Sequence, residues 1–546
     1  MKDSILANIY TQSFRKNWDF TAFTDYEGNN YTYSEVASNI KSLQHFYQLV
    51  GLRRGDKIAV LGRNSANWGT TFLSAISAGM VIVPVLPDFN DSDTNHIINH
   101  SESKIVICAK SLLGKIDFAK NENILAIIVI EDFSLYTSRI EGLEKMLSDS
   151  FLLTKENGLD KNDFEFAPCD PEETCMISYT SGTSGFTKGV MIPERSVVSN
   201  LIFAQDNMPL KPEDKIVSFL PMAHVYGLLF EFMFPVTLGC HITFLNRMPA
   251  PALLTKVFSE VKPHLIISVP LIIEKIYKKR ILPTLQKPII KILLKVPGIS
   301  GILLKKIKAK LVETFGGRFF EIVIGGAPLS TEVEQFLQQI KFPLTVGYGM
   351  TECGPLISYA AWDKTMPLSA GKLVDRMEVR IDSEDPYNEV GEIQVKGANV
   401  MKGYYKAPEI TQEVFTDDGW LKTGDLGVID KNNFIYIRGR SKNMILGSSG
   451  QNIYPEEIES KISNLPFVAE CVVIEREDKL VALVFPDFEA LKTENQAENE
   501  LPKIMEENRK KVNADLSKYE QISKIELVQN EFEKTPKRNI KRFKYV

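Results

Sequence analysis

A segment rich in hydroxyl groups and glycines, residues 179–190, is the part of the sequence best suited to chemistry. It reads Tyr-Thr-Ser-Gly-Thr-Ser-Gly-Phe-Thr-Lys-Gly-Val, with Lys188 near its end. Hydroxyl and glycine N–H groups can converge on polyphosphate oxygens, because glycine has no Cβ atom to keep the anion away. A Walker A loop would continue from its Gly-Lys pair to Ser or Thr, whereas Gly189 follows Lys188 here. Apolar runs on both sides disfavour the alternative of a flexible linker, so the pattern predicts a phosphate-binding loop.

A second segment, residues 345–352, reads Thr-Val-Gly-Tyr-Gly-Met-Thr-Glu. It has the form of a strand that ends in a Gly-Tyr-Gly turn, and open α/β sheets bind ligands at their strand ends. Glu352 supplies a carboxylate of the kind that holds Mg²⁺ beside phosphates. The alternative interpretation is a tight turn with a surface glutamate. Residues 324–329, Ile-Gly-Gly-Ala-Pro-Leu, are a weaker signal because they also suit a plain turn.

In their order along the chain, these motifs resemble those of the acyl-adenylate-forming superfamily, which includes acyl-CoA synthetases, luciferases and nonribosomal adenylation domains. The resemblance runs from about residue 56 to the tail and is strongest to bacterial long-chain fatty acid–CoA ligases. It also rests on residues 420–427 (Trp-Leu-Lys-Thr-Gly-Asp-Leu-Gly), 436–442 (Tyr-Ile-Arg-Gly-Arg-Ser-Lys), 218–227 and 450–459. The resemblance implies ATP, Mg²⁺ and CoA as ligands.

The resemblance also implies roles for individual residues. Tyr348 would stack on adenine, Thr351 would contact the α-phosphate, and Asp425 and Arg440 would bind the ribose. Lys442 would be the hinge between two domains. Catalytic roles fall to Lys188, Glu352, Lys541 and Lys537, and the metal to Glu352 and Thr183. The nucleotide site comprises Thr180, Ser181, Gly182, Thr183, Ser184, Gly185, Thr187, Gly326, Ala327, Pro328, Gly347, Tyr348, Gly349, Met350, Thr351, Asp425, Ile437 and Arg440. The acyl pocket comprises His224, Val225, Tyr226 and Gly227.

The tail departs from the pattern that it resembles. The family motif is Thr-Pro-x-Gly-Lys-x-x-Arg, but here Arg538 replaces the glycine and Asn539 replaces the lysine. A neutral amide cannot offset the negative charge of the transition state as an ammonium group does. Lys537 or Lys541 could substitute, because residues two apart in an extended segment project to the same face. The alternative is a slow adenylation half-reaction.

Length and composition limit the classes of protein. At 546 residues the chain is expected to form two or more domains. The net charge of −5 argues against a nucleic-acid binder. The N-terminus has no signal-peptide pattern, and no apolar run is long enough to span a bilayer. Six scattered cysteines without CxxC spacing predict reduced thiols and a cytoplasmic location.

Short β-branched runs alternate with helical patterns in the first part of the chain. Examples are residues 57–61, 81–85, 104–108 and 124–130. Continuous apolar strands separated by helices predict a parallel sheet covered on both faces. The sequence thus predicts an α/β fold, with a large N-terminal domain (residues 1–440) that ends in a small β-barrel-like subdomain. A small, mobile α+β domain (residues 441–546) follows, with helices at 455–465 and about 500–513.

Residues 264–315 combine lysines with Ile, Leu and Val. Between Lys275 and Lys310 there is no Asp or Glu. Basic, apolar, helix-compatible segments suit the surface of an anionic bilayer, and this stretch also resembles an insertion of long-chain acyl-CoA synthetases. One hypothesis is therefore peripheral contact of residues 275–310 with the inner membrane face. The other is a solvated face on a packed helical pair.

The overall hypothesis is an AMP-forming, ATP-dependent fatty acid–CoA ligase that acts on long chains. A fatty acid carboxylate would attack the α-phosphate of ATP, and the CoA thiol would then attack the acyl adenylate. Two alternatives stay open. One is a ligase for an acyl-carrier protein, or another acyl-adenylate synthetase. The other, motivated by Asn539, is a nucleotide-binding protein with impaired adenylation.

Overall fold

An eight-stranded sheet forms the centre of the N-terminal part in the computed structural model, which describes residues 4–181, 187–446, 451–477, 479–493, 496–535 and 540–545. Five adjacent strands are parallel, and β7, β9 and β20 are antiparallel to their neighbours. In sheet order the strands are β20 (Gly403–Tyr404), β9 (Thr187–Pro193), β8 (Thr174–Ser181), β4 (Val81–Val85), β3 (Lys57–Leu61), β5 (Ser103–Cys108), β6 (Ala126–Val129) and β7 (Leu135–Ser138).

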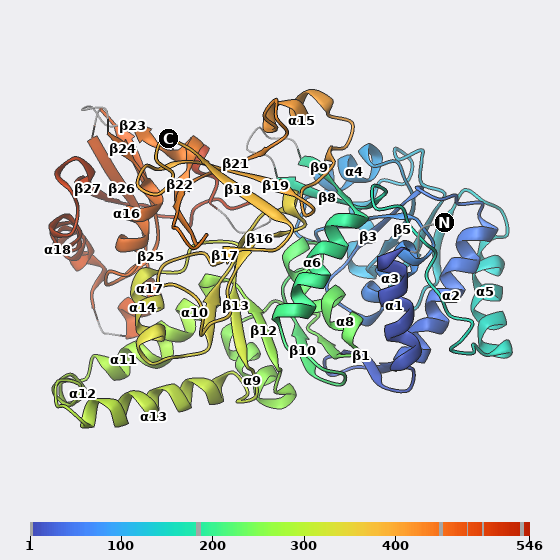
Figure 1. The fold of residues 1–546 in the computed structure, drawn as a ribbon, viewed down its shortest axis with the longest axis horizontal. Helices are drawn as coiled ribbons and strands as arrows, with labels where there is room; N and C mark the ends of the chain where they lie inside the picture. Colours follow the sequence, from blue (N-terminus) through green and yellow to red (C-terminus); the bar gives the residue numbers. More distant parts are fainter. Residues whose placement is uncertain are drawn as a thin grey trace.

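Both faces of this sheet are buried, as its continuous apolar strands predict. On β3, Ile58 and Val60 belong to one core cluster, while Ala59 and Leu61 belong to another. The first face is covered by α2 (Tyr33–Leu49), α3 (Ala66–Ser77) and α5 (Leu143–Asn157), and the second by α4 (Asp91–His100) (Figure 1). The parallel sheet expected from the early strands is therefore present.

Two further sheets complete the large domain and carry much of the site. A parallel sheet contains β12 (Leu265–Ser268), β13 (Glu321–Ile324) and β14 (Leu344–Val346). A mixed sheet contains β10 (Lys215–Ser218), β11 (His241–Phe244), β1 (Thr21–Asp25) and β2 (Asn30–Thr32). The helices around them are α1 (Ile5–Lys16), α6 (Glu194–Asn207), α7 (Val225–Gly227), α8 (Phe234–Leu238), α9 (Pro251–Val261), α10 (Pro270–Ile276) and α14 (Thr331–Gln339).

The β-rich part at the end of the large domain begins at residue 348 and consists of antiparallel strands. One sheet has the order β18 (Met377–Asp382), β19 (Gly391–Gly397), β21 (Leu421–Ile429) and β22 (Ile435–Arg440). A smaller sheet joins β15 (Tyr348–Gly349), β16 (Leu356–Tyr359) and β17 (Lys372–Leu373). Helix α15 (Pro408–Val414) lies between β20 and β21 in the sequence.

The C-terminal part has its own hydrophobic core. Its sheet has the order β25 (Val468–Arg476), β26 (Lys479–Pro486) and β27 (Ile522–Leu527), beside a short hairpin of β23 (Ile445–Leu446) and β24 (Asn452–Ile453). Its helices are α16 (Pro455–Ile462), α17 (Phe488–Thr493) and α18 (Leu501–Ala514). Helix α16 ends three residues before the predicted boundary of 465, and α17 was not predicted. The α/β class with a large and a small domain is confirmed.

Residues 277–314 form a helical projection below the C-terminal part (Figure 1). After α10 come η3 (Tyr277–Ile281), α11 (Leu282–Leu285), α12 (Pro288–Leu293) and α13 (Ile299–Thr314). Within the part of the chain that the structure describes, no helix combines the length and the apolar character needed to cross a membrane.

Candidate active site

A cleft of about 2560 Å³ lies where the N-terminal sheets, the β-rich part and the C-terminal part meet. Its walls include most of the predicted site residues, although these are spread over more than 360 positions of the sequence, from Thr180 to Lys541. The predicted residues that line it are Thr180, Lys188, His224, Val225, Tyr226, Gly227, Gly326, Ala327, Pro328, Gly347, Tyr348, Gly349, Met350, Thr351, Glu352, Asp425, Ile437, Arg440, Lys442 and Lys541.

The two ends of the predicted phosphate loop belong to the antiparallel strands β8 and β9. Thr180 is paired with Lys188, and Ser181 with Thr187. A Cβ atom on Gly189 would lie 2.9 Å from Cγ2 of Ile177, so glycine lets the strands approach closely. Of the predicted loop residues, Gly182, Thr183, Ser184 and Gly185 lie outside the described residues. The strand pairing places both ends of the loop together, with Thr180 and Lys188 at the cleft.

Lys188 and Glu352 both contact Tyr404, an aromatic residue that was not predicted. The Lys188 Nζ atom is 5.2 Å from the centroid of the Tyr404 ring. The Tyr404 hydroxyl donates a hydrogen bond of 2.9 Å to Oε1 of Glu352. Burial, reinforced by the Glu352 carboxylate, raises the pKa of Tyr404, so the hydroxyl stays a donor. Because β20 pairs with β9, Tyr404 is brought beside Lys188, and the Gly-Tyr-Tyr sequence alone was too weak a signal to reveal this.

A second polar cluster joins Tyr348, Asp425 and Arg440. The Tyr348 hydroxyl donates to Oδ2 of Asp425 at 2.7 Å, and Nε of Arg440 lies 2.6 Å from Oδ1. Asp425 and Arg440 are directly opposite each other on β21 and β22. Burial raises the pKa of Asp425, while the guanidinium and the tyrosine hydroxyl oppose that rise. The cluster presents a buried carboxylate with positioned donors, an arrangement that can bind vicinal hydroxyl groups.

The predicted acyl-pocket segment is held by two side chains that the motifs did not reveal. Glu231, on the π-helical turn η2 (Leu228–Met233), accepts the backbone N–H groups of Phe219 (3.0 Å) and Leu220 (2.9 Å). Burial raises the pKa of Glu231. Asn64 binds the same segment through the carbonyl of Leu220 at 2.7 Å. Glu231 and Asn64 thus position the wall that leads to His224.

Tyr226 connects the acyl-side wall to the Gly-Gly turn. Its hydroxyl donates to the carbonyl of Val323 on β13 at 3.1 Å. A Cβ atom on Gly325 would lie 2.8 Å from Cζ of Tyr226, so a larger residue would displace the ring. His224 is the residue before α7, and its carbonyl accepts the N–H of Leu228. The acyl-side and adenine-side motifs are therefore in direct contact.

The C-terminal part contributes cations to the cleft. Lys442 lines the cleft, and its pKa is lowered by burial, with Arg440 next in effect and Lys188 adding to it. Lys541 Nζ lies 3.9 Å from Oε2 of Glu533. Lys534 and Ile540 form an antiparallel β-bridge. Lys537 and Asn539, which come between them in the sequence, lie outside the described residues.

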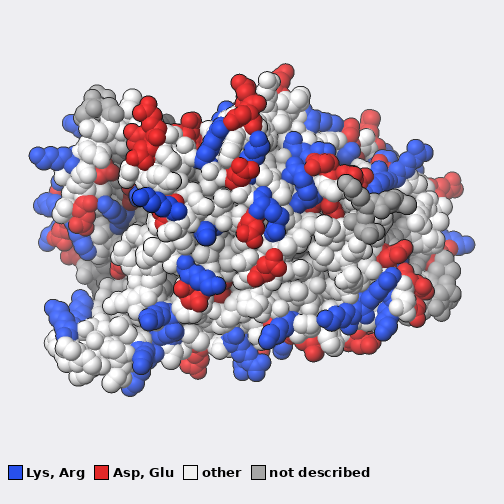
Figure 2. Space-filling model, viewed as in Figure 1, with Lys and Arg blue, Asp and Glu red and all other residues white. Residues whose placement is uncertain are grey.

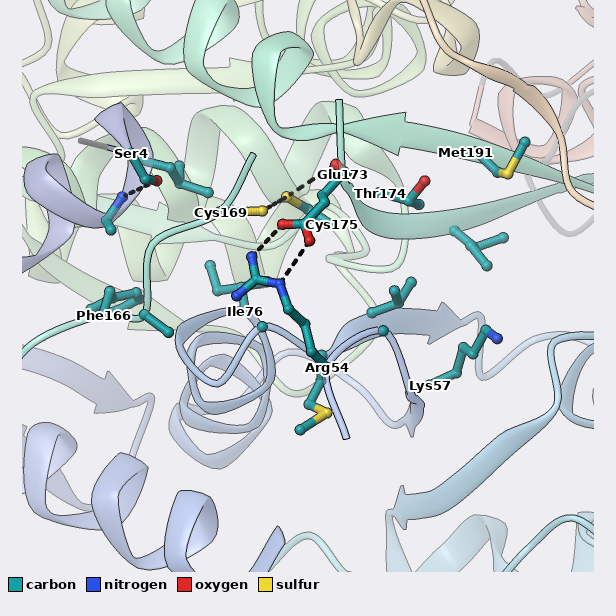
Figure 3. Close-up of a pocket in the computed structure, with 18 of the residues that line it drawn as sticks. Ser4, Arg54, Lys57, Ile76, Phe166, Cys169, Glu173, Thr174, Cys175 and Met191 are labelled. Atoms are coloured by element: carbon teal, nitrogen blue, oxygen red, sulfur yellow. Dashed lines mark hydrogen bonds and ion pairs between the residues drawn. The ribbon is translucent and has the colours of Figure 1, made fainter. Parts of the chain in front are cut away.

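A smaller cavity of about 360 Å³ lies elsewhere in the N-terminal part, at the start of β8 (Figure 3). Arg54 and Glu173 form an ion pair across it. The Sγ atoms of Cys169 and Cys175 are 4.0 Å apart. None of the predicted site residues lines this cavity.

Thr187 is the remaining predicted nucleotide-site residue whose side chain the structure describes. It lies on β9, and its Oγ1 atom is buried without a hydrogen-bond partner among the described residues.

The chain matches two family models and resembles curated proteins along most of its length. Residues 10–405 match the family described as AMP-binding enzyme, and residues 457–539 match the AMP-binding enzyme C-terminal domain. The long-chain-fatty-acid–CoA ligase of Bacillus subtilis is 28% identical over 526 residues, which are 92% of this chain and 88% of that protein. 4-Coumarate–CoA ligase 4 of Arabidopsis thaliana is 26% identical and covers 83% and 76% of the two chains.

Solved structures show the same fold at lower sequence identity. ATP-bound MatB from Rhodopseudomonas palustris superposes with a TM-score of 0.75 at 23% identity over 98% of both chains. The anthranilate CoA ligase AuaEII in complex with anthranoyl-AMP gives a TM-score of 0.77 at 19% identity, over 99% of this chain and 97% of that one. The resemblance inferred from the motifs is confirmed, and the chain belongs to the AMP-binding enzyme family, as an AMP-forming acyl-CoA ligase of the acyl-adenylate-forming superfamily.

Proposed function

We propose that the protein is an ATP-dependent, AMP-forming fatty acid–CoA ligase that acts on long chains. The observation that carries this proposal is the meeting of three clusters in one cleft: Lys188 with Glu352, Asp425 with Arg440, and the wall around His224. Apolar side chains continue the cleft beyond that wall, among them Phe219, Leu245, Met248, Ile272 and Leu329. A fatty acyl chain suits such a lining. Relatives that are named long-chain ligases support the substrate class.

In the first half-reaction, a fatty acid carboxylate oxygen attacks the α-phosphorus of ATP, and pyrophosphate leaves. Lys188 and the loop of residues 180–187 hold the β- and γ-phosphates, and Thr351 binds the α-phosphate. Asp425 and Arg440 hold the ribose, while Tyr348 contacts the adenine together with the turn at Gly326. Such chemistry depends mainly on positioning and charge neutralisation, which the two polar clusters provide.

The donor set near Lys188 is suited to Mg²⁺. In the described ranges, no three metal-binding side chains come together. Magnesium bound with nucleotides uses one or two carboxylates, with phosphate oxygens and water completing its shell. Glu352 meets that requirement, and Thr183 would be a second protein ligand. The ion, when bound, neutralises phosphate charge.

In the second half-reaction, the CoA thiolate attacks the acyl carbonyl carbon, and AMP leaves. We propose that residues 441–546 rotate as a lid about Lys442 against residues 1–440. The separate core of the C-terminal part and the short 3₁₀ turn at residues 441–443 support such a motion. Hinges are commonly a few residues at the ends of elements.

The positive charge that Asn539 does not provide is assigned to Lys541 or Lys537. Lys541 lies at the cleft, two residues after Asn539 in the sequence. Asn539 also favours a second candidate function, a nucleotide-binding protein with impaired adenylation. A ligase for a carrier protein or for another acid, as among the 4-coumarate and anthranilate relatives, is a further alternative. We propose a cytoplasmic location.

Pyrophosphate release tests the proposal directly. The protein would be assayed with ATP, Mg²⁺ and acids from acetate to oleate, with and without CoA. CoA-dependent turnover that is highest with long chains supports a long-chain ligase. Turnover indifferent to CoA indicates another acceptor, and turnover limited to short or aromatic acids overturns the long-chain assignment. ATP binding without pyrophosphate release supports the impaired alternative.

A further inference from the structure

We propose that a helical arm, residues 286–310, docks on the surface of an anionic lipid bilayer. The arm contains α12 and most of α13, and it projects from the body of the molecule (Figure 1). Docking is independent of the proposed function, because it concerns a surface outside the catalytic cleft. It can therefore be tested without ATP or an acyl substrate.

The first observation is a row of exposed branched side chains. Ile289 is 71% exposed, Ile292 is 65% exposed and Ile302 is 60% exposed, and Val296 and Ile299 are exposed as well. Helix α12 has no buried residue, and α13 has only Leu311. Clustered exposed apolar residues mark interaction sites, whereas single ones need no explanation. These exposed side chains are clustered on one short segment, which indicates a binding surface.

The second observation is the charge around this row. Lys287, Lys291, Lys295, Lys305, Lys306 and Lys310 are exposed, and the first acidic residue after Glu274 is Glu313. Figure 2 shows the projection at the lower left as an uncharged surface bordered by basic side chains. The whole chain carries a net charge of −5, so the positive charge of the arm is local.

The packing of α13 gives the arm a defined outer side. Leu304, Ile307 and Leu311 pack against the main core. Lys308 bonds to the carbonyl of Lys341, and its ammonium lies 5.9 Å from the ring centroid of Trp362. On the helical wheel, Ile302 and Lys306 lie opposite these residues, and Ile299 and Lys310 flank that outer side. The side left free therefore presents isoleucines and lysines together.

An anionic bilayer matches both features, because apolar side chains can enter its interface while lysines meet phosphate groups. A second copy of this chain would bring lysines against lysines. An acidic soluble protein would match the lysines but leave the isoleucines unexplained. The arm is joined through η3 and α11 to α10, of which Pro270, Leu271 and Ile272 line the cleft. If the proposed function holds, docking would bring the cleft close to a source of fatty acid.

The test is flotation of the full-length protein with vesicles of neutral phosphatidylcholine, alone or mixed with anionic phosphatidylglycerol. The wild type should float with the anionic vesicles only, and less at high salt. Reversal of three lysines (K287E, K291E and K295E) should lower the partition coefficient about a hundredfold or more. Replacement of two isoleucines (I289S and I292S) should lower it about tenfold or more.

Matched controls carry the same changes on other surfaces. The variant K503E, K510E and K511E alters exposed lysines of α18, and L152S alters an exposed leucine of α5. Both should float like the wild type. Circular dichroism and pyrophosphate release should be unchanged in the arm variants, which separates lost docking from misfolding. Failure of the proposed ligase activity would leave flotation unaffected.

Three results would overturn the proposal: a wild type that does not float, equal flotation with neutral vesicles, or equal losses in the control variants. Loss of flotation in the lysine variant alone, with the isoleucine variant unaffected, would contradict insertion of the isoleucines into the bilayer. A concentration-dependent dimer that disappears in the arm variants would assign the surface to a second copy.

Discussion

Lysines are used in two different ways in the cleft and on the arm. Lys188 lies over the Tyr404 ring, next to a carboxylate that the same tyrosine holds, and the pKa of Lys442 is lowered by burial and by Arg440. The arm lysines are exposed, with no acidic residue between positions 275 and 312. A cation in a positioned polar cluster acts through its location, whereas exposed cations act through their number. Single substitutions should therefore have large effects in the cleft and small effects on the arm.

The largest effect is expected for Lys188→Ala. Loss of a positioned cation at the phosphates should lower kcat/KM for ATP about a hundredfold to a thousandfold. Lys188→Arg should recover part of this loss, since it keeps the charge. Steady-state pyrophosphate release measures both variants, with Lys402→Gln, outside the cleft, as the control. A loss of kcat/KM below about fivefold would mean that the position of Lys188 contributes as little to activity as the position of any single arm lysine contributes to vesicle binding.

The second largest effect is expected for Asp425→Asn. The change weakens charge-assisted bonds to the ribose and leaves Arg440 without its ion-pair partner, so ATP affinity should fall about tenfold to a hundredfold. Calorimetric titration with ATP measures the loss directly. Asp418→Asn is the control, since its carboxylate pairs with Arg380 at an exposed site. Unchanged ATP affinity would remove Asp425 from the proposed ribose site.

Tyr404→Phe removes the hydrogen bond between the Tyr404 hydroxyl and Glu352. The ring under Lys188 is kept, so only the bond of 2.9 Å is lost, and kcat should fall about threefold to tenfold. The Mg²⁺ concentration for half-maximal rate should rise in parallel. Tyr405→Phe serves as the control, because its hydroxyl binds Glu102 instead. An unaltered Mg²⁺ dependence would contradict the role given to Glu352.

A single reversal on the arm, Lys291→Glu, should lower binding to anionic vesicles only about fivefold to tenfold. Pyrophosphate release in solution should not change. Lys510→Glu is the matched control. If Lys291→Glu alone abolished vesicle binding, the arm would contain a specific site, and its lysines would resemble those of the cleft.

The smallest effect concerns the pKa of Lys442. Burial, together with Arg440 and Lys188, lowers it, because each disfavours the charged form. Amine labelling of the intact protein followed by peptide mass spectrometry should give Lys442 a titration midpoint below the ordinary lysine value near 10.4. In an Arg440→Gln variant the midpoint should move upward. A midpoint at the ordinary value in the wild type would contradict the packing described for the hinge.

The sequence predicted the fold best where local pattern and burial agree. The apolar runs at 57–61, 81–85 and 104–108 became parallel strands buried on both faces, as continuous apolar runs require. The predicted helix at 455–465 was too long, because its end depends on packing and not on an obvious stop signal. Helix α17 is six residues long and lies in a polar stretch, where no periodicity reveals it.

The candidate site was predictable where a motif is continuous in the sequence. Residues 346–352 and 421–425 of the two motifs line the cleft. Glu231 and Tyr404 were missed because each acts on a partner that lies on another element. Neither residue stands in a pattern that distinguishes it from an ordinary core or sheet residue.

The sequence by itself determined the chemistry that the protein could perform: hydroxyls, glycines and a lysine for phosphates, a glutamate for magnesium, and the order of motifs that identifies the family. Only the tertiary structure decided that Lys188, Glu352 and Tyr404 meet, because strand pairing sets the distances between remote residues. It also decided the orientation of α13. Apolar residues lie all around that helix, so periodicity does not select a face, and packing of Leu304, Ile307 and Leu311 against the core does.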